Sequence, residues 1–183
     1  MYTALLLLIL AASILCLGGI YYKKSVTFGL LVPGALLMII IAFLSTAVLP
    51  SMEKIPSTPK GLPYTEKQLL GRKIYVREGC VYCHTQQVRP IKTDAGLGSV
   101  SQAGDYLYDY PHLLGTERTG PDLSHLGGKY EDQWHRNHLT NPRPKRPEEE
   151  GMPGKVPGSI MPAFSYLSGE EMDALIAYLQ VLR

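Results

Sequence analysis

Two long stretches near the N-terminus carry no charged side chain, and both are long enough to cross a membrane. Apart from Lys23 and Lys24, every Lys, Arg, Asp and Glu of the 183-residue chain lies at Glu53 or later. The stretches run from about 3 to 22 and from about 27 to 49, and each reaches the roughly 20 apolar residues that a transmembrane helix needs. The sequence therefore predicts a hairpin of two transmembrane helices within residues 1–50.

An alternative for the first stretch is a cleaved signal peptide. The stretch lacks the basic segment and the A-x-A-like cleavage site of such peptides, and Leu15 before Cys16 makes a poor lipoprotein signal, so we favour a retained span. Lys23 and Lys24 lie between the spans, and the positive-inside rule places them in the cytoplasm. The remainder of the chain then emerges on the extracytoplasmic side of the lipid bilayer.

Residues 51–63 are rich in proline and lack apolar periodicity, which predicts an extended linker. Residues 64–183 are expected to form an all-α domain. Thr65–Gln68 and Ser168–Glu171 both have the form of a capping box, and apolar side chains at helical spacing follow each of them. The net charge of +2 is too small to indicate a nucleic-acid partner.

A C-x-x-C-H motif, Cys80-Val81-Tyr82-Cys83-His84, follows the first of these helices. Two thiols at this spacing reach the two vinyl groups of one porphyrin, and the adjacent histidine then lies under the iron. A zinc site would need four ligands, and the third cysteine, Cys16, lies in an apolar stretch. A redox dithiol would need a βαβ context that is not visible. The motif therefore predicts one covalent haem c, attached outside the cytoplasm.

The second axial ligand of this haem has several candidates. Met161 lies in an apolar segment able to close over a haem, whereas Met152 follows three glutamates, so Met161 is favoured. The competing residues are Met152, His112, His125, His135 and His138. If Met161 closes the coordination sphere, the iron has no open position and the chain passes electrons without catalysing a reaction itself.

Three segments together carry a resemblance to a known family: residues 78–90, 118–123 and 134–143. They resemble the mono-haem cytochrome c subunit (subunit II) of the C-family, cbb-type haem–copper oxygen reductases. The resemblance implies a class I-like cytochrome c domain with Cys80 and Cys83 bonded to haem and His84 and Met161 as axial ligands. It also implies a haem pocket lined by Thr119, Gly120 and Pro121. Arg89 and Arg136 are candidates to pair with the haem propionates, because a guanidinium fork suits carboxylates.

The same resemblance implies the place of the chain in a larger assembly. The subunit would lie in the bacterial cytoplasmic membrane with its haem domain in the periplasm, against an integral-membrane subunit that carries haem b and the haem–copper centre. It would accept electrons from another cytochrome c subunit or a soluble cytochrome c. The alternatives are the cytochrome subunit of a nitric oxide reductase, a free-standing anchored electron shuttle, and a haem-based gas sensor, which would need an open ligand position.

Overall fold

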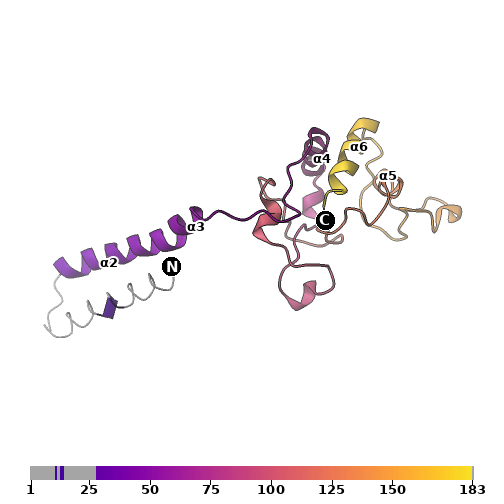
Figure 1. Ribbon diagram of the computed structural model, residues 1–183. Helices are drawn as coiled ribbons and strands as arrows, with labels where there is room; N and C mark the ends of the chain where they lie inside the picture. The colour runs from indigo at the N-terminus through magenta and orange to yellow at the C-terminus, as the bar shows by residue number, and fades with distance from the viewer. Residues whose placement is uncertain (1–10, 12, 15–27, 183) are drawn as a thin grey trace. The chain divides into compact units, whose positions relative to one another are not determined.

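The computed structural model describes residues 11, 13–14 and 28–182. The chain divides into two compact units, Met1–Lys54 and Ile55–Arg183 (Figure 1). Each unit is described by itself below.

The first unit contains the apolar helix that the second uncharged stretch predicts. Helix α2 (Phe28–Phe43) continues through a π-helical segment, η1 (Leu44–Val48), into α3 (Leu49–Ser51). The segment Val32–Ser51 is one helix that is long and apolar enough to cross a membrane, which supports the second predicted span. The first predicted span, about 3 to 22, lies outside the described residues except for Ala11, Ser13 and Ile14.

The second unit is helical, and no strand occurs in the part of the chain that the structure describes, as the all-α prediction required. Its longer helices are α4 (Glu66–Arg77), α5 (Asp132–Thr140) and α6 (Gly169–Leu179). Short 3-10 segments lie between them: η2 (Cys80–Tyr82), η3 (Lys92–Asp94), η4 (Ala103–Tyr106) and η5 (Pro147–Glu149). Both predicted capping boxes form, at Thr65 with Gln68 and at Ser168 with Glu171.

Helices α4 and α6 pack against each other and supply most of the core (Figure 1). A side chain at Gly71 of α4 would place its Cβ 1.9 Å from the carbonyl oxygen of Ala174 in α6, so the two backbones touch at this point. The buried rings of Tyr75 and Tyr178 meet edge to face beside it, with centroids 5.4 Å apart. The contact fixes the position of α4 and of the C-x-x-C-H motif that follows it.

The C-terminal part of the predicted linker contacts the domain. The Thr58 hydroxyl donates to Asp105 Oδ1 at 2.6 Å, and Lys60 Nζ lies 2.8 Å from His125 Nε2. A Cβ at Gly104 would lie 2.2 Å from the Pro56 carbonyl oxygen. Residues 56–60 therefore pack on the domain surface, and the extended part of the linker is shorter than the sequence indicates.

We predict that Gly71→Ala destabilises the domain, because the added methyl group has no space against the α6 backbone. Overpacking of this kind costs about 1–3 kcal/mol, so the thermal unfolding midpoint followed by far-UV circular dichroism should fall. Gly169→Ala at the start of α6 is the matched control, since its Cβ would meet nothing within 4 Å. Equal midpoints for the two variants would contradict the proposed backbone contact.

Candidate functional site

The C-x-x-C-H motif forms a tight turn directly after α4. Gly79 ends the helix with a left-handed φ of 73°, which glycine adopts without strain. The backbone N–H groups of Cys83 and His84 both donate to the Cys80 carbonyl, at 3.2 and 3.0 Å. Cys80 is half-buried and packs against the core, whereas Cys83 is exposed. Two thiols and an imidazole therefore belong to one short turn.

The Cys80 thiol of this turn is poorly suited to thiolate chemistry. Burial raises the pKa of Cys80 to about 12, so its sulfur stays protonated at neutral pH and is a weak nucleophile and metal ligand. No group of three or more His, Cys, Asp or Glu side chains that could hold a metal ion occurs among the described residues. The raised pKa of Cys80 therefore gives no support to a redox dithiol at this turn.

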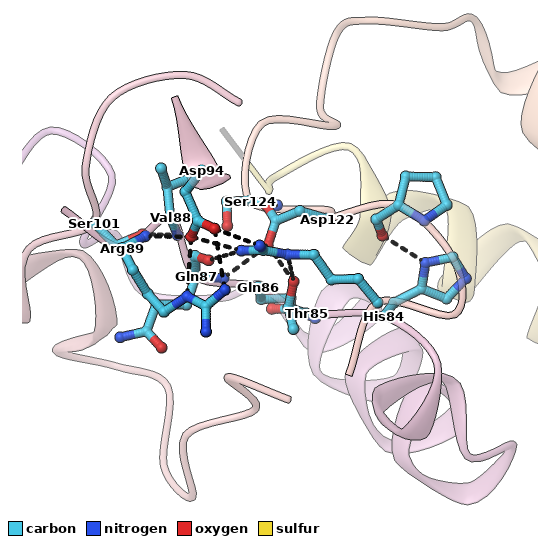
Figure 2. Close-up of polar contacts among 12 residues, drawn as sticks. His84, Thr85, Gln86, Gln87, Val88, Arg89, Asp94, Ser101, Asp122 and Ser124 are labelled. Carbon is cyan, nitrogen blue, oxygen red and sulfur yellow. Dashed lines mark hydrogen bonds and ion pairs between the residues drawn. The ribbon is translucent and has the colours of Figure 1, made fainter. Parts of the chain in front are cut away.

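His84 is held in one orientation by the Thr119–Pro121 segment. Its Nδ1 lies 2.7 Å from the Pro121 carbonyl oxygen (Figure 2), and because a carbonyl only accepts, Nδ1 carries the proton. Nε2 then keeps its lone pair, the arrangement typical of a metal-bound histidine. A Cβ at Gly120 would lie 2.2 Å from His84 Cε1 and 2.8 Å from Nε2. Only glycine fits against this face of the imidazole.

Backbone hydrogen bonds fix the same segment to the motif. The N–H of Gly120 donates to the Cys83 carbonyl at 2.8 Å, and the N–H of Leu123 donates to the Thr85 carbonyl at the same distance. Gly120 and Pro121 thus lie against His84, whereas Thr119 is exposed. The lining of a haem pocket by these three residues stays a prediction.

A buried carboxylate, Asp94, organises the chain after the motif (Figure 2). Its side chain is fully buried and accepts from Arg118 Nη1 at 2.6 Å and from Arg89 Nη2 at 3.0 Å. Arg118 also donates to Thr85 Oγ1 and to the Gln87 carbonyl, at 2.7 and 2.8 Å. Hydrogen bonds from Arg118, and then from Arg89, hold the pKa of Asp94 well below its usual range. The network ties the residues after His84 to a distant loop.

Sequence reasoning missed Asp94 and Arg118 as structural partners. The two lie 24 residues apart, and no local pattern joins them, although Arg118 directly precedes the Thr119–Pro121 segment. Asp94 engages Arg89 Nε and Nη2, so the contact of Arg89 with a haem propionate stays a prediction. Arg136, the other candidate for such a contact, pairs with Asp173.

Met161 packs against the hydrophobic core together with Cys80 and Val81. Its loop is held in place by Arg143, whose Nη1 donates to the Met161 carbonyl at 2.9 Å and to the Ser159 carbonyl at 3.2 Å. Met152 is 48 % exposed. Packing therefore favours Met161 over Met152 as a ligand, and its bond to the iron stays a prediction.

The remaining histidines have different surroundings. His112 is exposed and contacts the rings of Tyr106 and Tyr110, whereas His125 is engaged by Lys60 and Ser99. His135 is buried in α5, and its Nε2 has no hydrogen-bond partner. In His138, Nδ1 contacts the Gly154 carbonyl at 2.8 Å.

Comparison with known proteins identifies one family. The family described as cytochrome c oxidase, mono-haem subunit/FixO, matches residues 23–173 of the chain. This range includes the motif, the Arg118–Leu123 segment, α5 and Met161. No curated protein matches the chain.

We predict that Asp94→Asn lowers the free energy of unfolding far more than Asp173→Asn does. The first change leaves two arginines without their buried anion, whereas the second affects a pair in which both side chains are 39 % exposed or more. Chemical denaturation followed by the fluorescence of Trp134 measures both.

The effect of Asp94→Asn should also depend on pH. Because the pKa of Asp94 is lowered in the folded chain, its stabilisation is fully present above the unfolded value of about 3.9 and is lost as the pH falls through the lower folded value. The difference in free energy of unfolding between Asp94→Asn and the wild type should therefore be constant from pH 5 to 7 and decrease below about pH 4. A gap that widened in acid would contradict the ionised network.

Proposed function

Because the chain belongs to the FixO family of mono-haem cytochrome c oxidase subunits, we propose that it carries one haem c and relays electrons to the catalytic subunit of a cbb-type oxygen reductase. The observation that carries the proposal is the geometry around His84. Its Nδ1 is held by the Pro121 carbonyl, and Cys80 and Cys83 in the same motif are both free thiols.

The residues of this site fit a covalently bound haem. Cys80 and Cys83 would form the thioether bonds, and His84 would supply one axial nitrogen through Nε2. Gly120 supports this assignment because a side chain at this position would collide with the imidazole of His84. Met161 would supply the second axial group from a loop that Arg143 holds in place.

The protein groups around such a haem have defined tasks. Bound haem c supplies an iron that accepts and gives up single electrons. The hydrogen bond from His84 Nδ1 to Pro121 prevents the imidazole from rotating and keeps Nε2 unprotonated. The thioether of Met161 favours the reduced state relative to a second imidazole. With His84 and Met161 both holding the iron, the chain would leave no position open for oxygen, and the subunit would transfer electrons only.

We also propose that the chain is anchored by a helical hairpin with its haem domain in the periplasm. The apolar helix Val32–Ser51 supports a span, and the contact of Ser13 Oγ with Met38 Sδ, at 3.8 Å, supports a neighbouring first span. Lys23 and Lys24 place the intervening loop in the cytoplasm by the positive-inside rule. Two spans also offer the catalytic membrane subunit a larger packing surface than a single anchor does.

We predict that the haem stays on the chain in a denaturing gel, as thioether bonds require. In-gel haem staining should be positive for the wild type and for Cys16→Ala, the control that leaves the motif intact. The haem stain should be lost in the double variant Cys80→Ala/Cys83→Ala, since that variant retains no thiol in the motif. Staining that survives in the double variant, or that is absent from the wild type, would refute covalent attachment.

We further predict that purification through this chain in mild detergent brings a catalytic subunit with it. The reduced complex should show b-type haem besides haem c, and carbon monoxide should alter part of the spectrum. The purified complex should consume oxygen, whereas consumption of nitric oxide alone would favour a nitric oxide reductase. A lone low-spin c-type spectrum that carbon monoxide leaves unchanged would instead indicate an anchored shuttle.

A further inference from the structure

His138 lies in α5 directly before Leu139, a residue that binds the loop carrying Met161. Leu139, its neighbour in α5, accepts a backbone hydrogen bond from Phe164 at 2.8 Å. Arg143, shortly after α5, binds the Met161 carbonyl. The loop of Met161 is thus connected at two points to the end of α5 and to the residues that follow this helix.

The ring of His138 is fixed from two sides. Its Nδ1 lies 2.8 Å from the Gly154 carbonyl oxygen, and its plane stacks on Trp134 with centroids 4.7 Å apart and an interplanar angle of 15°. Trp134 in turn stacks on Tyr130 at 3.9 Å. Gly154 allows this arrangement because a Cβ there would lie 2.4 Å from the Trp134 carbonyl oxygen. The imidazole therefore has one available orientation.

In this orientation, Nε2 of His138 has a lone pair that is available to coordinate a metal. Nδ1 faces a carbonyl, which only accepts, so Nδ1 carries the proton and Nε2 carries the lone pair. The structure gives Nε2 no hydrogen-bond partner among the described residues. Burial lowers the pKa of His138 and thus favours the neutral ring.

His84 and His138 share a feature that the other three histidines lack. In both, Nδ1 is bound by a backbone carbonyl, and Nε2 remains available. In His125, by contrast, Nε2 lies within hydrogen-bond distance of Lys60 and Ser99. A backbone carbonyl on Nδ1 is the support that orients metal-binding histidines and makes them more basic.

We propose that His138 is a reserve axial ligand, whose Nε2 takes the iron position vacated when the Met161 sulfur dissociates. The inference rests on the proposed haem c and its Met161 ligand. The exchange breaks one sulfur–iron bond and forms one nitrogen–iron bond, with no transfer of electrons or protons. Its consequence is a haem that stays closed to external ligands and has a lower reduction potential, because an imidazole replaces a thioether.

Spectra of the purified holoprotein complex test the inference, with the haem c signals of this chain as the readout. The ferric wild type should show the near-infrared charge-transfer band of sulfur-ligated haem. Met161→Ala should lose that band, remain low-spin with the near-infrared magnetic circular dichroism of two imidazoles, and leave haem c unreactive toward carbon monoxide. Its haem c potential should fall.

The matched variant is His138→Asn, in which the asparagine amide can still donate to the Gly154 carbonyl although Nε2 is gone. Alone, this change should leave the sulfur band in place. In Met161→Ala/His138→Asn, haem c should become high-spin and bind carbon monoxide. Met161→Ala/His112→Asn is the control for loss of an exposed histidine, and it should behave like Met161→Ala.

Two results would overturn the reserve ligand while leaving the proposed function intact. One is a high-spin, carbon monoxide-binding haem c in Met161→Ala with His138 present. The other is a low-spin Met161→Ala haem c that His138→Asn does not change. Absence of the sulfur band from the wild type would instead refute Met161 as the ligand, and the inference with it. Absence of covalent haem would refute the proposed function itself.

Discussion

The contact between Gly71 in α4 and Ala174 in α6 positions the rest of the haem domain. Where the two backbones touch, no side chain fits between them, so the helices are held at one separation and the aromatic rings beside them interlock. The motif begins three residues after α4 ends at Arg77. A helix–helix contact that involves no residue of the motif therefore determines the position of Cys80 and of the turn that follows.

From this base the site is built as two parts, each supported by residues far away in the chain. On one part, the Gly120–Pro121 segment fixes His84, and the buried Asp94 holds the loop after the motif through Arg118. On the other, Leu139 of α5 and Arg143 hold the Met161 loop. In both parts a backbone carbonyl accepts a hydrogen bond from a side chain, that of Pro121 facing His84 and that of Met161 binding Arg143.

Features that depend on near neighbours in the chain were predicted correctly. The capping boxes at Thr65 and Ser168 form because an N-cap and its partner are three residues apart. The apolar helix Val32–Ser51 follows from the absence of charge over a membrane-sized stretch. The family was evident from three short motifs, and the match over residues 23–173 confirms it. The class I-like fold and the axial ligands stay predictions.

The sequence by itself determined the helical class, the C-x-x-C-H turn and the candidate ligands, because each depends on residue types at short, fixed spacings. Only the tertiary structure decided that Arg89 pairs with Asp94, that Met161 packs on the core while Met152 is exposed, and that His138 keeps Nε2 free. These outcomes depend on contacts between segments that the chain brings together only when it folds. Such contacts cannot be read from residue spacing in a single sequence. They depend on the loop-closure entropy and the packing of the whole domain.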